Sequence, residues 1–412
     1  MADNTVTSAA NLLYELRGPL QFNYRKKYPL MGEVERRSPR DLMTGNTVRV
    51  PIVLNSLQGG GNPGETGTIN VPQVLNTTQA NIGVVDVVQP FSLSLDLEEQ
   101  SMDNAAAEAL TLLTQEARNS LAEIVNDQFN AAGGLLAQPA SGAGSPGLTI
   151  TLAATTNFDR LYPGRVVDVL TRSSGADPGA GKRRKIVSFA ESSLQVTFDT
   201  NQTASDGGSG NITWSANEGI YIAGSYGNCT QSIQDAAATS GIFQTINKAN
   251  VAGWQGVDGR GGDTTSKALS DEILDGGVRR GRRNGAFAWQ FGMGDPAVID
   301  LWKQGKYAQV RYDPQVSTLQ SGFSGTVYDG ADQPIPLIKE DRFELNQLML
   351  IPTDDIKIYG RGGGPDFVSD DGAIARRFSR ALPKEIWYRD KLQLAFLRCN
   401  RLVKFANLSR AA

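Results

Sequence analysis

The chain of 412 residues contains no histidine and only two cysteines, Cys229 and Cys399. Without histidine there is no Ser-His-Asp or Cys-His catalytic triad, no His-ligated zinc site, and no general base of the commonest type near neutral pH. Two cysteines allow at most one disulfide, and two idle thiols in a reducing compartment are the favoured interpretation. Carboxylate, lysine and nucleotide chemistry remain open.

Positive charge is missing from a long stretch, because no lysine or arginine occurs between Arg49 and Arg118. The net charge of −3, from 40 basic and 43 acidic residues, does not indicate a general nucleic-acid binder. The chain has no run of 18 apolar residues and does not begin with a secretory signal, so we expect no membrane association. Its 40% hydrophobic content is enough for two or three domains with cores.

Residues 1–45 predict an arm. A short helix over residues 9–17 ends at Gly18-Pro19, a helix-stop signal. The aromatic and basic residues of the arm have little local sequence to pack against, so we expect docking on a neighbouring subunit; a mobile terminus is the alternative. The predicted contact residues are Phe22, Tyr24, Arg25, Lys26, Lys27, Tyr28, Arg36 and Arg37.

Residues 46–98 predict an extended β-hairpin, since Val48, Val50 and Ile52 alternate with other residues and residues 58–67 form a Gly-rich turn. Such a hairpin has little core of its own and needs a partner surface. Residues 101–132 then predict a long helix, capped by Ser101 or Asp103 and stopped by Gly133-Gly134. At 1.5 Å per residue it forms a rod of about 45 Å, which suits a spine.

Residues 135–147 predict a linker, and residues 148–223 a small separate barrel or sandwich of short strands with Gly-rich turns. Its predicted strands are 148–152, 165–171, 185–189, 194–198, 211–214 and 219–222. Beyond it the pattern is mixed. We expect helices at 231–238, 266–280 and 296–304, strands at 286–291, 335–337, 348–351 and 356–359, and a β-rich end over 385–408.

Two basic clusters stand out, residues 182–185 and residues 279–283. The first is best interpreted as a solvated turn. The second places four arginines, Arg279, Arg280, Arg282 and Arg283, around one glycine, more than a helix end requires. We therefore consider contact with DNA phosphates for these four.

Two Gly-rich loops look superficially like nucleotide sites. Residues 175–182 fail the phosphate-loop pattern, because one residue too many separates the glycines and Arg183 replaces the magnesium-binding Ser or Thr. Residues 360–365 match no dinucleotide fingerprint and precede Asp366, Asp370 and Asp371. The acidic loop at 366–371 leaves a metal-dependent carboxylate enzyme as one rival hypothesis. A surface adhesin-like β protein, suggested by residues 148–223, is another.

The order of arm, long hairpin, spine helix, inserted β unit, mixed region and β-rich end resembles the major capsid protein of tailed bacteriophages, the Hong Kong ninety-seven-type fold. Local support comes from residues 292–297, which look like the family's methionine–proline turn before a helix, and from residues 335–339, 348–352 and 356–359, which resemble its late strands. The resemblance implies an α+β fold with axial and peripheral domains.

Carried onto this chain, the resemblance implies an arm at 1–45, an extended loop at 46–98 and a peripheral domain with the spine helix at 99–147. It further implies an inserted β domain at 148–223, a peripheral return at 224–240, an axial domain at 241–380, and C-terminal strands at 381–412.

The function implied is that of a non-enzymatic shell protein that encloses double-stranded DNA in an icosahedral virion head and assembles in the bacterial cytoplasm without a cofactor. Its partners would be copies of itself in pentamers and hexamers, a separate scaffolding protein, a portal, a decoration protein and the packaged DNA. A phage-like compartment that packages protein cargo is the alternative.

The chain departs from some relatives, which join a lysine on the extended loop to an asparagine on a neighbour. Residues 46–98 contain no lysine, so we expect a non-covalent shell. We hypothesise that the basic arm pairs with an acidic segment of the adjacent subunit. Each exposed pair contributes only ~0.2–1 kcal/mol, so apolar burial must supply most of the stability. The acidic partners would be Asp86, Asp96, Glu98, Glu99 and Asp103.

Overall fold

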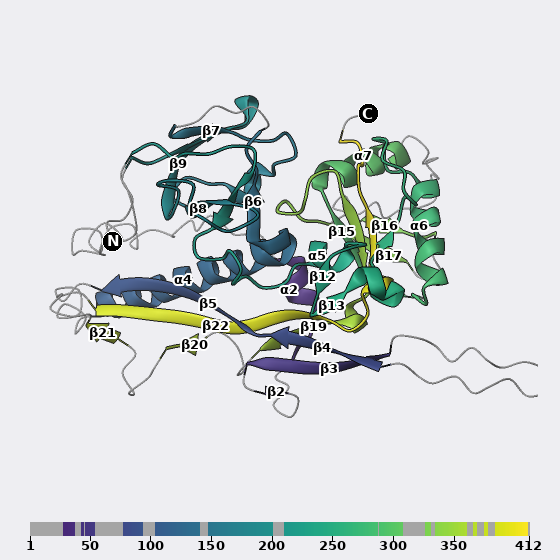
Figure 1. Cartoon of the computed structure of the whole chain (residues 1–412), viewed down its shortest axis with the longest axis horizontal. Coiled ribbons are helices and arrows are strands. Elements are labelled where there is room, and N and C mark those ends of the chain that lie inside the picture. The colour runs from purple at the N-terminus through teal and green to yellow at the C-terminus, as the bar shows by residue number, and fades with distance from the viewer. Residues whose placement is uncertain are drawn as a thin grey trace, which may run out of the picture. The chain divides into compact units, whose positions relative to one another are not determined.

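The computed structural model describes residues 28–37, 43–44, 46–53, 77–93, 104–140, 147–200, 210–286, 288–307, 326–330, 334–360, 366–368, 375–377 and 384–410. The chain divides into two compact units (Figure 1). The first comprises Met1–Ser38, Val85–Ser232 and Tyr359–Gln393, and the second Pro39–Val84, Ile233–Ile358 and Leu394–Ala412. Each unit is therefore assembled from segments that are distant in the sequence.

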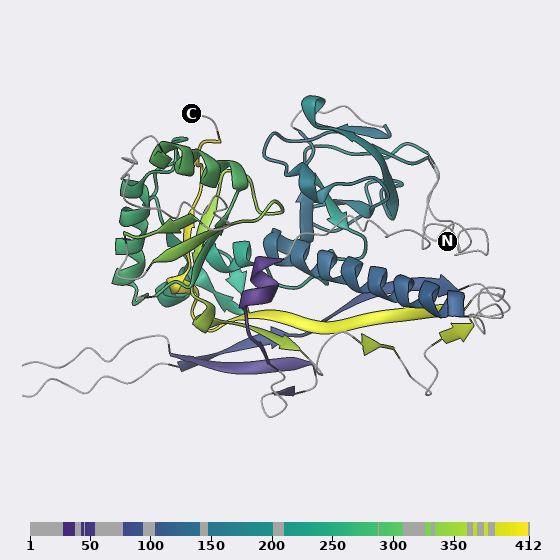
Figure 2. The same cartoon turned by 180° about the vertical axis from the view of Figure 1, so that it is seen from behind.

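The first unit is built on a long helix and a long strand pair. Helix α4 (Asn104–Asn130) has 27 residues, or about 40 Å, and confirms the predicted long helix. Strand β5 (Val85–Leu93) pairs antiparallel with β22 (Lys384–Phe396) along its whole length, and α4 runs along this pair (Figure 2). The Ser120 hydroxyl lies 3.2 Å from Oε1 of Gln89 and ties the helix to β5.

Shorter elements complete this sheet, whose order is β1-β19-β22-β20 with β5 and β21 also paired to β22. They are β1 (Arg36–Arg37), β19 (Ile356–Gly360), β20 (Asp366–Phe367) and β21 (Ala375–Arg377), and the short helix α2 (Pro29–Glu33) precedes β1.

The β-rich part of the first unit is a six-stranded sheet of order β6-β11-β8-β9-β10-β7. A bridge between Pro139 and Leu152 joins the chain after β6 to the end of β7, so the sheet closes on itself around a core that includes Ile150, Val169 and Ile220. Its strands are β6 (Leu135–Ala137), β7 (Thr149–Thr151), β8 (Val166–Thr171), β9 (Arg184–Ala190), β10 (Gln195–Phe198) and β11 (Glu218–Ile222).

Two sequence expectations for this part differ from the structure. The segment predicted as a linker at 135–147 supplies β6, because Leu136 and Ala137 are buried in the core. The strand predicted at 211–214 is reduced to one bridge between Ile212 and Gly147. The Gly, Ala and Pro content of residues 135–147 concealed the short strand β6. Residues 211–214 form only the bridge to Gly147, so they do not make a strand.

The second unit contains a six-stranded mixed sheet of order β14-β23-β18-β15-β17-β16. Helix α6 (Asp271–Arg283) packs on β14 and β23, and α7 (Pro296–Tyr307) lies against β17. The remaining helix, α5 (Ile233–Ala237), and the hairpin β12 (Ile242–Phe243) and β13 (Ile246–Asn247) precede the sheet. Its strands are β14 (Val257–Asp258), β15 (Phe291–Gly294), β16 (Thr326–Tyr328), β17 (Ile335–Lys339), β18 (Leu348–Ile351) and β23 (Val403–Phe405).

Helix α6 and the strand that follows it begin later than the sequence suggested. The strand expected at 286–291 lies at Phe291–Gly294, because Gly292 and Gly294 permit close approach: an added Cβ would lie 2.6 Å from Leu337 Cδ2 and 2.7 Å from the Gln347 carbonyl oxygen. The helix expected from residue 266 begins at Asp271, where Ser270 accepts a hydrogen bond from the Ile273 amide at 3.3 Å.

The segment predicted as one extended hairpin, 46–98, is divided between two sheets. Strands β3 (Thr47–Val53) and β4 (Thr77–Gly83) pair antiparallel, and β2 (Met43–Thr44) pairs with β3 (Figure 1). The following strand, β5, pairs with β22 instead, and β5 also packs against the long helix α4. The predicted turn at 58–67 lies outside the described residues.

Candidate assembly surfaces

Most residues predicted to make subunit contacts lie outside the described part of the chain. These are Phe22, Tyr24, Arg25, Lys26 and Lys27 of the arm, and Asp96, Glu98, Glu99 and Asp103 of the acidic segment. Tyr28 is described and half-buried, and its carbonyl accepts a hydrogen bond from the Gly32 amide at 3.1 Å. The arm hypothesis therefore stays a prediction for these positions.

The remaining charged members of the hypothesis have partners within their own chain. The Arg36 guanidinium donates two hydrogen bonds to the Asp390 carboxylate, at 2.9 and 2.5 Å, with Asp390 only 4% exposed. Arg37 pairs with Glu35 at 2.8 Å on the surface. Asp86 lies 3.1 Å from Lys391 Nζ, across the β5–β22 pair. Arg36 thus holds β1 to its sheet, a role that the sequence analysis did not foresee.

Helix α6 separates its arginines from a face of small residues. Gly277 and Gly281 pack against β23 and its surroundings: an added Cβ would lie 2.2 Å from the Phe405 ring at the first and 2.5 Å from Trp289 at the second. The glycine within the arginine cluster is therefore required by packing. Of the four arginines, Arg279 and Arg283 are exposed.

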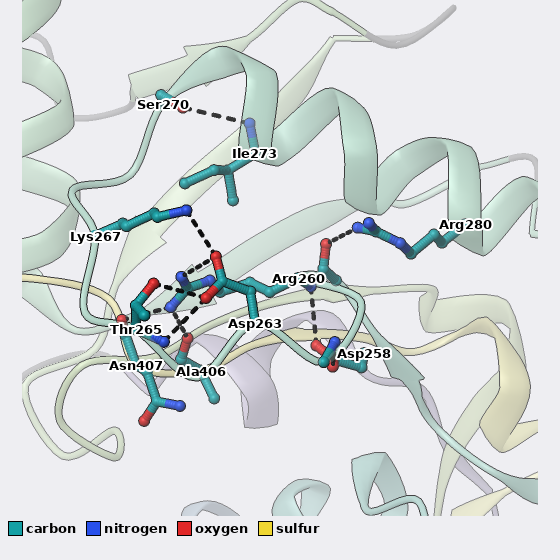
Figure 3. Close-up of polar contacts among 12 residues, drawn as sticks. Asp258, Arg260, Asp263, Thr265, Lys267, Ser270, Ile273, Arg280, Ala406 and Asn407 are labelled. Carbon is teal, nitrogen blue, oxygen red and sulfur yellow. Dashed lines mark hydrogen bonds and ion pairs between the residues drawn. The ribbon is translucent and has the colours of Figure 1, made fainter.

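Arg280 has a structural role beside the loop that precedes α6. Its Nη1 donates to the Gly259 carbonyl at 2.5 Å, while Arg260 Nη1 donates to the carbonyls of Ala406 and Asn407 at 3.1 and 2.7 Å (Figure 3). The two side chains thus join α6, the loop after β14 and the segment after β23. Arg260 and Arg280 therefore stabilise the fold through hydrogen bonds to backbone carbonyls.

Asp263 organises the same loop, as Figure 3 shows. Its carboxylate accepts hydrogen bonds from the Thr265 hydroxyl at 2.6 Å and from Lys267 Nζ at 2.8 Å, and lies 3.0 Å from Arg260 Nη2. The hydrogen bond from Lys267, followed by those from Thr265, holds the pKa of Asp263 well below its usual range. The carboxylate is therefore ionised throughout the physiological range.

A cavity of about 630 Å³ lies between this loop and α6. Its charged lining is nearly balanced, since Arg260, Lys267, Arg279 and Arg280 face Asp263, Glu272 and Asp275. A pocket with so little excess charge favours neither an anion such as phosphate nor a cation. Within the described residues no group of three or more Cys, Asp or Glu residues is arranged to hold a metal ion.

Five cations of the described residues are buried, and the sequence indicated a structural role for none of them: Arg160, Arg165, Arg184, Lys248 and Arg260. Lys248, 0% exposed, donates to the carbonyls of Asp235, Ala236 and Ala238 at 2.6 to 2.8 Å, and burial lowers its pKa. Arg184 donates to backbone carbonyls of three loops, and burial likewise lowers its pKa. Arg165 lies 2.6 Å from Asp127 of α4 in a pair that is almost completely buried. No spacing rule identifies such partners, because they come from distant segments.

The basic cluster 182–185 is part of this buried framework. Arg184 is buried while its neighbours Lys182, Arg183 and Lys185 are exposed. The interpretation as a solvated turn holds for the exposed residues but misses the structural role of Arg184.

Neither Cys229 nor Cys399 forms a disulfide. Burial raises the pKa of Cys399 to about 12, so its thiol carries no nucleophilic role near neutral pH. Asp366 lies in β20, whereas Asp370 and Asp371 of the rival enzyme hypothesis lie outside the described residues. None of the described helices is both long enough and apolar enough to span a membrane.

Comparison with known protein families finds no matching family model. No curated protein matches the sequence either. Among solved structures, the cyanophage A-1(L) capsid asymmetric unit is similar with a TM-score of 0.54 at 13% identity, covering 94% of this chain and 95% of that chain. The capsid of a native GTA particle has a TM-score of 0.45 at 8% identity, covering 94% and 93%. For Gordonia phage Cozz the values are 0.43 and 11%, covering 98% and 95%.

The likeness to the cyanophage capsid extends over nearly the full length of both chains, so no large part of this chain falls outside it. The resemblance inferred from the order of parts is thereby confirmed at the level of the fold. The chain has the mixed α/β fold of phage capsid proteins.

Proposed function

We propose that this chain is the shell protein of a tailed-phage head or a related particle, and that many copies assemble through non-covalent contacts into a closed icosahedral shell around double-stranded DNA. The observation that carries the proposal is the full-length likeness to the cyanophage A-1(L) capsid. Fold alone does not fix function. The long strand pair β5–β22 and the projecting pair β3–β4 support the proposal, because both offer extended surfaces instead of an enclosed site.

In this proposal the parts keep the roles that the resemblance implies. Residues 46–98 are the extended loop, 99–147 and 224–240 belong to the peripheral domain, 148–223 form the inserted domain, and 241–380 the axial domain. Pentamers and hexamers of the chain form the shell, with a scaffolding protein, a portal and a decoration protein as separate partners. The absence of lysine from residues 46–98 supports non-covalent assembly.

Purified protein is expected to form closed uniform shells, or rings of five and six subunits. Negative-stain microscopy with a sizing run alongside tests this directly. A stable monomer or dimer at all salt concentrations, unchanged by an added scaffolding protein, contradicts the proposal.

In the same assay, neutralising Arg25, Lys26 and Lys27 together is expected to lower shell yield, because the arm loses its charge complementarity to the acidic segment. An undiminished yield refutes the arm pairing alone.

Among the four arginines considered for DNA contact, the two exposed ones, Arg279 and Arg283, are the better candidates, since Arg280 donates to the Gly259 carbonyl. Replacing both by glutamine is expected to lower the salt dependence of binding to double-stranded DNA by about one per arginine in the log–log slope. The matched control replaces Lys182 and Arg183, which are also exposed and basic. Equal effects of the two double variants contradict a specific role for α6.

A further inference from the structure

The strained turn between β12 and β13 contacts the projecting β3–β4 pair. The two strands are joined by only two residues, Gln244 and Thr245, whose φ angles are +49° and +66°. Two-residue hairpin turns with both φ angles positive normally use Asn-Gly or similar pairs, and a β-branched threonine in this region is a genuine outlier. Such strain persists only where the surrounding structure over-determines it.

The turn meets β4 at one backbone amide. The N–H of Asn81 points to the Gln244 carbonyl oxygen at 3.3 Å and to the Thr245 hydroxyl oxygen at 3.4 Å. Asn81 lies opposite Arg49 in the β3–β4 ladder, and β3 is the strand on the other side of β4. The amide that faces the turn would otherwise be an open donor on a sheet edge.

The turn itself stands on a rigid base. Gln244 is 2% exposed and Phe243 3% exposed, and the Phe243 carbonyl accepts from Trp254 Nε1 at 3.2 Å. Lys248 Nζ lies 5.0 Å from the centre of the Phe243 ring and also holds the carbonyls at the end of α5. The turn therefore cannot move without disturbing buried contacts.

The opposite edge of the pair is also held. β2 pairs with β3 through Met43–Val48 and Thr44–Thr47, and the Val84 amide donates to the Asn46 carbonyl at 2.8 Å. On the inward face Val48, Ala80 and Ile82 are each 0% exposed. The β3–β4 pair is thus held at both edges and on one face.

We propose that Gln244 and Thr245 are positioning residues: their left-handed turn fixes the orientation of the β3–β4 pair on the β12–β13 hairpin of the same unit. The backbone strain is retained because only this conformation presents the Gln244 carbonyl and the Thr245 hydroxyl to the Asn81 amide. A relaxed turn takes both acceptors away from that amide, so the outer edge of β4 is no longer held by the turn. The consequence for shell formation rests on the proposed function, whereas the local contact does not.

Thr245→Gly separates strain from positioning, because glycine accepts positive φ freely and removes the hydroxyl. Unassembled protein is expected to keep or raise its unfolding midpoint. The variant lacks the hydroxyl acceptor, and its glycine can also leave the φ that presents the Gln244 carbonyl to Asn81. Hydrogen exchange of the Asn81 amide, measured in the peptide spanning residues 77–83, is therefore expected to accelerate about tenfold, the order for one lost hydrogen bond. Thr245→Asn, which tolerates positive φ and retains a side-chain acceptor, is expected to remain close to the parent protein.

The matched control is Ala180→Gly, which relieves a positive φ of +54° in the loop between β8 and β9 of the first unit. It is expected to leave exchange at residues 77–83 unchanged. Unchanged exchange in Thr245→Gly, or the same acceleration in both glycine variants, overturns the proposal. Shell yield is measured separately: if the parent protein itself forms no shells, the proposed function fails while the exchange result still decides the role of the turn.

Discussion

Replacing Arg165 by alanine is expected to lower the free energy of unfolding by about 3–5 kcal/mol, the range for removing one partner of a buried ion pair. Arg165 lies 2.6 Å from Asp127, and the two side chains are 4% and 0% exposed. It also donates to the Arg160 carbonyl at 2.6 Å, and Arg160 donates to the Asn130 carbonyl at 3.3 Å. The substitution leaves a carboxylate of α4 buried without its cation and loosens the closed sheet from the helix.

The loss is expected to be much smaller when both charges are removed. Arg165→Met combined with Asp127→Leu replaces the pair by apolar groups, a change that is often neutral or stabilising. The surface control is Lys391→Met, whose partner Asp86 is 45% exposed and which should cost at most about 1 kcal/mol. Guanidinium unfolding followed by the combined fluorescence of the five tryptophans, of which Trp214 is buried in the core of the closed sheet, measures each change. Equal decreases in the free energy of unfolding for Arg165→Ala and Lys391→Met would show that the buried ion pair contributes no more to stability than the surface pair.

Two adjacent glycines of α6 are expected to respond to alanine in opposite directions. A Cβ at Gly277 would lie 2.2 Å from Phe405 Cζ, so Gly277→Ala should cost about 1–3 kcal/mol through overpacking. At Gly276 the nearest atom outside the helix backbone is Arg280 Nη1 at 3.4 Å, which is an ordinary van der Waals distance. There Gly276→Ala should stabilise the protein by about 0.5–1 kcal/mol, because alanine is the better helix former.

The comparison is controlled internally, since both substitutions add one methyl group to the same helix. Thermal and denaturant unfolding of the two variants and the parent protein provide the measurement. Destabilisation by both alanines, or by neither, contradicts the packing of α6 on Phe405. The sign of the difference matters more than its size, because partial relaxation of the Phe405 ring reduces the cost.

Local patterns identified the long helix and most strands. Regular apolar spacing before Gly133-Gly134 predicted α4, and alternation predicted β3, β8 and β10 within one or two residues. Proline after Asp295 correctly marked the start of α7, where the Asp295 carboxylate accepts from the Ala297 amide at 3.0 Å. These features are local, because a helix or turn is specified by residues that are near one another in the chain.

Assignment of strands to sheets lay beyond the sequence. The alternating residues of β5 continue the pattern of β3 and β4, yet β5 pairs with β22, almost 300 residues later. Likewise, Asp390 gives no sign that it is the partner of Arg36, and nothing near Lys248 shows that it caps α5. Periodicity tells which face of an element is buried but not against which element.

The sequence by itself determined what this protein lacks, namely histidine anywhere and lysine in residues 46–98, together with the order of most helices and strands, because composition and local spacing are properties of the chain. Only the tertiary structure decided which charged side chains bind partners within the fold and which are exposed at the surface. Arg184, Arg165 and Arg280 are held by carbonyls or carboxylates from distant segments, while Arg279 and Arg283 are exposed. The physical reason is that burial makes a charge depend on its partner, and partners are brought together only by folding.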